Sequence, residues 1–142
     1  MKSTTTYLHF SGNCRSAMAF YYKIFGGELE ITAFPDASGQ QNTDPEAPVM
    51  HSKLALGGQP VLMASDYPPG VDASGQGNHF SVFIDCSSDN ELDTLFAGLA
   101  RGGAVTVPPS DMPNGRFAMC DDQFGTSWIL NTESAKESAQ VQ

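Results

Sequence analysis

One order of segments occurs twice along this chain: a strand, a helix closed by two adjacent glycines, and then three strands. In the first copy, a strand is expected at residues 4–10, and apolar residues at helical spacing run from Cys14 to the double glycine at 26–27. In the second copy, the strand is expected at 79–85, and the helix ends at the double glycine 102–103. The repetition predicts two βαβββ modules.

The other strands are expected at residues 28–34, 49–56 and 60–65 in the first copy, and at 104–107, 116–120 and 126–130 in the second. Neither module can bury the inner face of its sheet alone, so two must pair and enclose a cup. The predicted fold class is therefore α+β, with two βαβββ modules forming a cup. We expect one domain over residues 1–142, with modules at about 4–65 and 78–131 and a polar tail at 132–142. The alternative is a generic α+β domain with accidental symmetry.

Charge and cysteine usage narrow the possible partners and the compartment. Seven Lys and Arg against 16 Asp and Glu give a net charge of −9, which repels nucleic acid and anionic membrane surfaces. The chain has no apolar leader and no apolar stretch of bilayer length, so a membrane is not an expected partner. Three widely spaced cysteines without a Cys-x-x-Cys suit free, buried thiols in a reducing cytoplasm.

Several phrases carry a family resemblance over roughly residues 6–131. They are Tyr7–Cys14, Phe25–Glu28, Leu62–Asp66 and Asp122–Trp128. In these phrases the chain resembles PhnB-like proteins of the vicinal-oxygen-chelate superfamily, which includes glyoxalases, bleomycin resistance proteins and dioxygenases. It departs from them at 111–116, where the usual aromatic residue is missing. The resemblance implies the cup-shaped fold and a homodimer.

The superfamily's usual chemistry is a divalent metal in the cup that polarises vicinal oxygens of a substrate. By this resemblance, the four ligand positions fall on Thr6, Met63, His79 and Ile129. Only His79 is a good ligand for such a metal, and a catalytic Zn²⁺ needs three protein ligands. We therefore predict no metal and no cofactor. A slip of one residue in the first strand would instead bring in His9, and His51 is a further candidate from the third strand.

The leading functional hypothesis is a protein that binds a small organic molecule in the cup. The expected ligand-binding residues are Met63, Ser65, His79, Ser81, Arg116 and Ile129. Tyr67 is a further candidate for the lining, whereas Trp128 has the opposite parity to Ile129 and is expected to pack under a helix. One alternative is a metal-dependent enzyme of the glyoxalase, lyase or dioxygenase type that uses His79. Another is an interaction module whose dimer surface is its function.

Other catalytic motifs receive a structural interpretation. PhnB-like chains have also been labelled as a ubiquinone-pathway methyltransferase domain, but a doubly wound methyl-donor site needs a Gly-rich turn between a strand and a helix. Gly75-Gln76-Gly77 precedes a strand and is expected to be a loop. Asp121 and Asp122 stand next to a turn, where Asp bonds to the local backbone, so we do not assign them an acid–base role. No catalytic residue is assigned.

Overall fold

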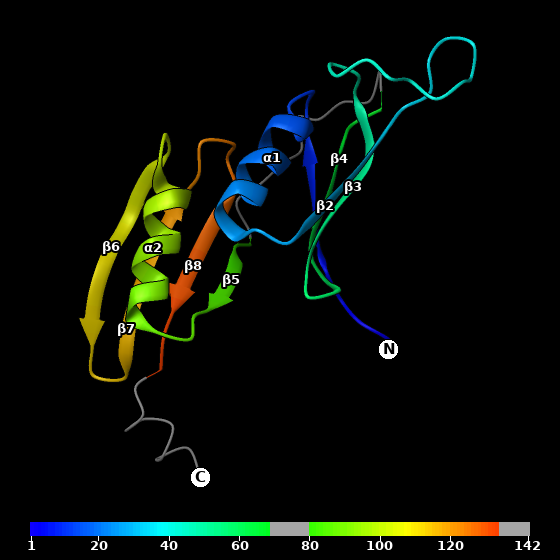
Figure 1. The fold of residues 1–142 in the computed structure, drawn as a ribbon. Helices are drawn as coiled ribbons and strands as arrows, with labels where there is room; N and C mark the ends of the chain where they lie inside the picture. Colours follow the sequence, from blue (N-terminus) through cyan, green and yellow to red (C-terminus); the bar gives the residue numbers. More distant parts are fainter. Residues whose placement is uncertain (69–79, 134–142) are drawn as a thin grey trace. The chain divides into compact units, whose positions relative to one another are not determined.

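The computed structural model describes residues 1–68 and 80–133. The chain divides into two compact units, Met1–Gln76 and Gly77–Gln142 (Figure 1). The first contains β1 (Thr6–Phe10), α1 (Cys14–Phe25), β2 (Glu28–Ala33), β3 (Val49–Leu56) and β4 (Gln59–Asp66). The second contains β5 (Val82–Asp85), α2 (Asp89–Ala100), β6 (Ala104–Met112), β7 (Gly115–Asp121) and β8 (Ser127–Asn131). The predicted repeat of βαβββ modules is confirmed.

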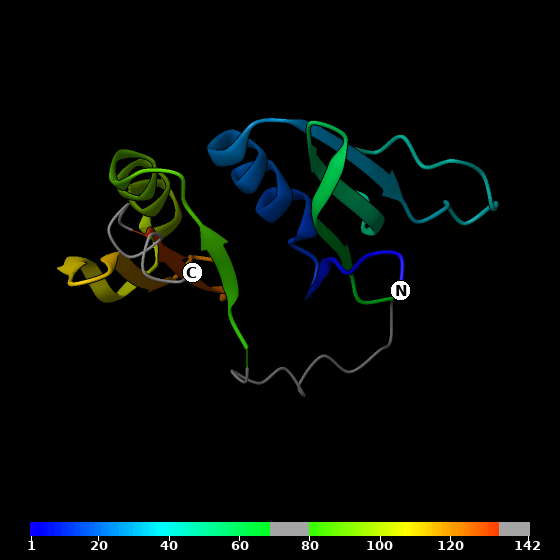
Figure 2. The same ribbon diagram turned by 90° about the horizontal axis from the view of Figure 1, so that it is seen from below.

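The first unit is a four-stranded sheet with a helix on one face. Its strands lie in the order β1-β4-β3-β2, with β1 parallel to β4 and the other neighbours antiparallel. Helix α1 lies along the sheet (Figures 1 and 2). The core consists of apolar side chains of the helix and of alternate strand residues, including Leu8, Phe10, Leu54, Leu62, Met18 and Tyr21. Alternation then sends the remaining strand residues to the face opposite α1. We call it the uncovered face, because no helix within residues 1–68 lies on it.

A buried carboxylate at the end of β4 fastens this unit together. Asp66 Oδ1 accepts hydrogen bonds from the backbone amides of Gly12 (2.9 Å) and Cys14 (3.0 Å), and Oδ2 accepts one from Val49 N (2.9 Å). Asn13, which precedes α1, makes no capping bond with its side chain. The start of the helix is therefore held by a distant strand and not by a local side-chain cap.

The second unit repeats this design. Its strand order is β5-β8-β7-β6, with β5 parallel to β8. The side chain of Ser88 accepts a hydrogen bond from Glu91 N at the start of α2, as in a capping box. The Glu91 carboxylate accepts one from the amide of Ser87, one residue before the cap. Trp128 is 1% exposed under the helix, and its Nε1 donates to Asp122 Oδ2 (2.8 Å). The prediction that Trp128 packs under a helix is confirmed.

Asp122 also confirms the turn interpretation. Its Oδ1 accepts from the amides of Phe124 (2.8 Å) and Thr126 (3.0 Å), so the carboxylate closes the turn between β7 and β8. Asp121 receives a hydrogen bond from the hydroxyl of Ser127 on the neighbouring strand. Both carboxylates thus serve local structure.

Strand β6 is longer than the sequence pattern indicates. It runs to Met112, whereas the expected strand ends at Val107, just before Pro108 and Pro109. The strand lies at the edge of the sheet, where a residue without a backbone N–H can face away from the neighbouring strand and no hydrogen bond of the sheet is lost. Its register with β7 also shifts between Val107 and Ser110. An edge position therefore explains the two prolines.

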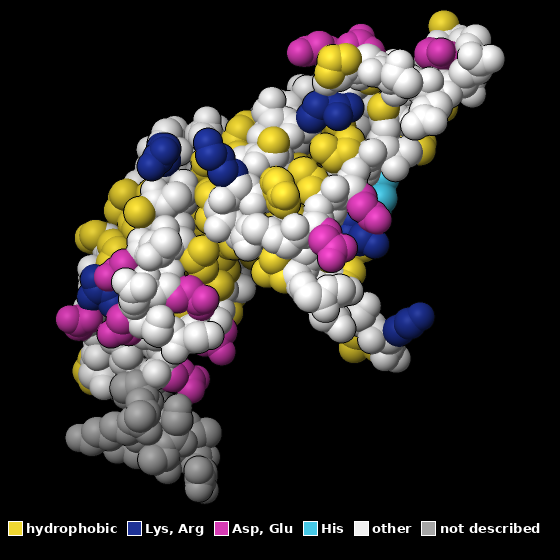
Figure 3. Space-filling model, viewed as in Figure 1, with side chains coloured by type: hydrophobic (Ala, Val, Ile, Leu, Met, Phe, Trp, Pro, Cys, Tyr) yellow, Lys and Arg dark blue, Asp and Glu magenta, His cyan; other side chains and the backbone are white. Residues whose placement is uncertain are grey.

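No helix in the two described stretches of the chain is long and apolar enough to cross a bilayer. In Figure 3, basic side chains are few beside the acidic ones, in keeping with the net charge of −9. This view shows no continuous basic surface of the kind that nucleic acid would need.

Candidate functional site

Four ring side chains form a row on the uncovered face of the first sheet. The ring of Tyr7 lies 5.2 Å from that of His9 and 5.8 Å from that of His51, measured between centroids. Beyond His9, the ring of Tyr67 follows at 5.2 Å, nearly parallel to it. The Tyr7 hydroxyl is hydrogen-bonded to His51 Nδ1 at 3.2 Å. We call these four residues the ring row.

Strand alternation and register place the ring row on this face. In β1, Leu8 and Phe10 point toward α1, so Tyr7 and His9 point away from it. The parallel pairing of β1 with β4 puts Met63 beside Tyr7 and Ser65 beside His9. The predicted ligand residues Met63 and Ser65 therefore share a face with the ring row.

The expected register of β1 is corrected by one residue. Thr6 pairs with Leu62, which is buried against the helix, and not with Met63. The residues of β1 that share the face of Met63 are Tyr7 and His9. The assignment of the first ligand position to Thr6 was therefore wrong. It was made by counting residues back from the helix motif, and such counting does not allow for the length of the turn between β1 and α1.

One row of residues crosses all four strands of this face. Tyr7 of β1 pairs with Met63 of β4, Met63 with Lys53 of β3, and Lys53 with Glu30 of β2. Lys53 Nζ and a Glu30 carboxylate oxygen are 3.2 Å apart, and the Glu30 side chain is 72% exposed. The Lys53 ammonium thus lies next to the surface formed by Met63 and Tyr7. Its ion pair with Glu30 is weak, because the Glu30 side chain is exposed to solvent.

The residues at the superfamily's metal positions do not fit a metal site of the usual kind. On this face, the first-strand position holds Tyr7 or His9 and the fourth-strand position holds Met63, a soft thioether. In the second unit, Ile129 has no donor atom. Across residues 1–68 and 80–133, no group of three His, Cys, Asp or Glu side chains has a spacing that could hold a metal ion. His9 and His51 do share a face, as the alternative register proposed, but the Tyr7 ring lies next to both.

The ligand-binding residues predicted in the second module lie at different places in its structure. Ile129 of β8 pairs with Phe83 of β5 and with Met119 of β7 on the face away from α2, and Phe83 is 58% exposed. Ser81 is exposed just before β5. His79 lies outside the described residues.

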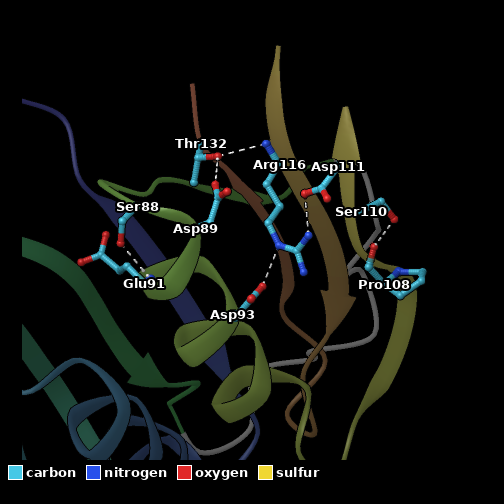
Figure 4. Close-up of polar contacts among 9 residues, drawn as sticks. All are labelled: Ser88, Asp89, Glu91, Asp93, Pro108, Ser110, Asp111, Arg116 and Thr132. Atoms are coloured by element: carbon cyan, nitrogen blue, oxygen red, sulfur yellow. Dashed lines mark hydrogen bonds and ion pairs between the residues drawn. The ribbon is translucent and has the colours of Figure 1, made fainter. Parts of the chain in front are cut away.

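Arg116 lies on the helix side of its sheet. Its parity is that of the buried Ala118, and its guanidinium bonds to Asp93 Oδ1 of α2 (2.8 Å) and to Asp111 Oδ1 of β6 (2.7 Å), as Figure 4 shows. The Asp93 carboxylate, followed by that of Asp111, raises the pKa of the Arg116 guanidinium. Two carboxylates already satisfy this cation, so the structure gives it a role in joining α2 to the β6–β7 hairpin.

A hollow of about 320 Å³ lies at the end of the second unit. It is lined by Met112, Asn114, Gly115, Phe117, Asn131 and Glu133. The hollow adjoins segment 111–116, in which the chain departs from its resemblance. It contains none of the residues expected to bind a ligand.

The three cysteines are buried and free, as expected. Burial raises the pKa of each thiol to about 11. A thiol in this state is a poor nucleophile at neutral pH, so none of the three is a candidate catalytic residue.

Comparison with known proteins agrees with this fold. The sequence model of the 3-demethylubiquinone-9 3-methyltransferase family matches residues 2–131. Protein YjdN of Escherichia coli is 31% identical over 140 residues, covering 88% of this chain and 91% of its own length.

Two solved structures resemble the chain over nearly its whole length. Protein PA1353 from Pseudomonas aeruginosa has a TM-score of 0.79 at 34% identity, covering 94% of this chain and 98% of its own. The PhnB protein from Bacillus cereus has a TM-score of 0.73 at 29% identity, covering 92% and 99%. A glyoxalase/bleomycin resistance/dioxygenase domain from Frankia, 14% identical with a TM-score of 0.65, shares the fold. The chain belongs to the 3-demethylubiquinone-9 3-methyltransferase, or PhnB-like, family, and its fold is that of the glyoxalase/bleomycin resistance/dioxygenase superfamily.

Proposed function

We propose that this protein binds a small organic molecule on the uncovered face of its first sheet. The observation that carries the proposal is the ring row, in which Tyr7, His9, His51 and Tyr67 stand together on one face with Met63 and Ser65. Small-molecule sites commonly combine apolar or aromatic surface with a few polar groups that orient the ligand. Tyrosine and histidine rings supply both, because each has a flat body and a hydrogen-bonding edge.

The second module contributes further residues to this proposal. Ile129, Ser81 and His79 are also proposed as ligand contacts, as the cup predicted from the sequence requires. We leave Arg116 out of the site because its guanidinium is committed to Asp93 and Asp111. The site then offers an apolar surface with tyrosine, histidine and serine groups.

Binding is favoured over methyl transfer by the connections between strands and helices. A doubly wound methyl-donor site requires a Gly-rich turn at such a connection. The turn from β1 to α1 is Ser11-Gly12-Asn13, and the turn from β5 to α2 is Cys86-Ser87-Ser88. Neither has the required glycine spacing, so the family's name does not by itself assign the reaction to this chain.

A pair of tyrosine variants tests the location of the ligand site. A ligand is first identified by screening a small-molecule library for a shift in thermal stability, since a ligand that binds only the folded state raises the melting temperature. Tyr7→Ala is expected to weaken its binding at least tenfold, because truncation removes both ring surface and a hydroxyl. Binding is measured by isothermal titration calorimetry.

Tyr22→Ala is the matched control for this variant. Tyr22 is 45% exposed on α1, whereas Tyr7 is 39% exposed on the uncovered face, so both variants remove a partly exposed tyrosine. Equal affinity losses in the two variants would contradict the proposed site. Elemental analysis of the same protein, repeated after incubation with Zn²⁺, Ni²⁺, Mn²⁺ and Fe²⁺, addresses the metal-dependent enzyme. Stoichiometric metal that is lost in His79→Ala would favour that alternative.

We also propose a homodimer in the cytoplasm. The side chain of Phe83, which is 58% exposed and lies beside Ile129, gives the second sheet apolar surface that a second copy of the chain would bury. Three buried, unpaired cysteines suit a reducing compartment. Light scattering coupled to size-exclusion chromatography is expected to give twice the chain mass of 15.1 kDa, and a monomer at all concentrations would contradict the dimer.

A further inference from the structure

We infer that the first-sheet site selects a flat, anionic ligand, of which an aromatic carboxylate is the simplest example. The inference rests on the proposed function and specifies its ligand class. It comes from the row of residues Tyr7, Met63, Lys53 and Glu30 that crosses the four strands.

Met63 forms the floor of this row, between an aromatic residue and a cation. It pairs with Tyr7 on one side and with Lys53 on the other. Neighbouring strands are about 4.8 Å apart, so the Tyr7 and Lys53 backbones are separated by about 10 Å. A bicyclic aromatic acid is of similar length. Its rings can lie on the thioether of Met63, a favourable sulfur–aromatic contact, while its acid group reaches Lys53.

The Tyr7–His51 pair supplies a hydrogen-bond donor whichever tautomer the imidazole adopts. If the tyrosine hydroxyl donates to His51 Nδ1, the ring proton is on Nε2 and that N–H is the remaining donor of the pair. If Nδ1 carries the proton and donates to the hydroxyl oxygen, the hydroxyl hydrogen is the remaining donor. A neutral pair therefore always retains one donor for a ligand.

Charge decides between an anion and a cation as the occupant. An aromatic surface by itself also attracts quaternary ammonium groups. Here the Lys53 ammonium, whose side chain is 35% exposed, stands in the same row and repels a cation. Its present partner, Glu30, is on the edge strand β2 and 72% exposed, so a ligand carboxylate displaces it at little cost.

The test uses three probes with purified full-length protein at low ionic strength. 2-Naphthoate is flat and anionic, 2-naphthamide is flat and neutral, and cyclohexanecarboxylate is anionic without a flat ring. Binding of each is measured by calorimetry. We expect 2-naphthoate to bind at least fivefold more tightly than either of the others, because only it satisfies both the aromatic surface and the cation.

Variants with opposite expected effects locate the charge. Lys53→Met is expected to weaken 2-naphthoate binding about tenfold, the usual value of a hydrogen bond to a charged group. Glu30→Gln is expected to strengthen it about twofold, because the competing carboxylate is gone. Lys23→Met, on α1, removes the same charge away from this face and is expected to have no effect beyond a small screened one.

Several results would overturn the inference. Equal binding of the amide, equal binding of cyclohexanecarboxylate, or an unchanged affinity in Lys53→Met would each do so. If no probe binds while a library ligand binds and depends on Tyr7, the ligand class is wrong and the proposed function stands. If a library ligand binds independently of Tyr7, the proposed site itself fails.

Discussion

Replacing Gly27 with alanine is expected to destabilise the first module by about 3 kcal/mol. Gly27 follows α1 at a φ of +86°, and a Cβ there would overlap the backbone carbonyl oxygen of Ala55 and lie 2.5 Å from Cδ2 of Leu56. The obstacle is backbone of β3, which pairs with β2 from Glu28 onward and cannot move without breaking the ladder. Urea denaturation followed by circular dichroism measures the loss.

Gly57→Ala is the matched control for the contact made by Gly27. Gly57 also has a positive φ, +57°, but a Cβ there would meet nothing within 4 Å. This variant is expected to lose about 1 kcal/mol, the cost of the left-handed conformation for a residue with a side chain. Equal losses in the two variants would show that conformation alone, and not the approach of β3, requires glycine at 27.

In the second module, Gly103→Ala tests the contact with the neighbouring strand alone, because no left-handed backbone conformation adds to its cost. A Cβ on Gly103 would overlap the carbonyl oxygen of Asp121 on β7, and the φ of this glycine is not positive. The two double glycines were predicted as helix ends, and both do follow helices. Contact with the neighbouring strand is the additional reason for the second glycine of each pair, and no local pattern could reveal it.

Much of the fold could be predicted because its determinants are local. Apolar spacing from Cys14 and the double glycine at 26–27 located α1, and the double glycine at 102–103 located the end of α2. The predicted and observed bounds of the strands agree within a few residues, except for β6, which continues through Pro108 and Pro109 to Met112. Prolines fit in this strand because it lies at the edge of the sheet, and its edge position could not be known from the sequence. The N-terminal cap of α1 could not be predicted, since Asp66 lies 52 residues from Cys14 in sequence.

The candidate site could be predicted only in part. Met63 and Ser65 lie on the uncovered face, and Tyr67, a weaker candidate, lies in the ring row. Tyr7 was missed, although its alternation with the buried Leu8 and Phe10 is a signal for that face. Its contact with His51 depends on the order of strands β1, β4 and β3 in the sheet. This order brings two residues that are 44 positions apart in sequence within hydrogen-bonding distance.

Replacing Asp66 with alanine is expected to cost the first module about 4 kcal/mol or more. The carboxylate is 3% exposed and accepts hydrogen bonds from three backbone amides, those of Gly12, Cys14 and Val49. Each buried amide left without an acceptor costs about 1–3 kcal/mol. Because the amides belong to the β1–α1 turn, the start of α1 and the start of β3, one substitution loosens three segments. Urea denaturation and amide hydrogen exchange at Cys14 and Val49 measure the effect.

A more conservative variant distinguishes the contribution of the Asp66 hydrogen bonds to stability from the contribution of the volume that its side chain fills. Asp66→Asn keeps the shape and one acceptor oxygen but turns an NH₂ group toward an amide donor, so it is expected to lose about half as much as Asp66→Ala.

Asp36→Ala provides the contrast in exposure. The Asp36 carboxylate accepts bonds from Ser38 Oγ and N and from Gln40 N within a surface loop, and the Ser38 hydroxyl, followed by the Gln40 amide, lowers its pKa. Its bonds resemble those of Asp66 in number, but water replaces them when the carboxylate is removed, so a much smaller loss is expected. If Asp36→Ala and Asp66→Ala proved equally destabilising, burial would not be what makes the Asp66 carboxylate important.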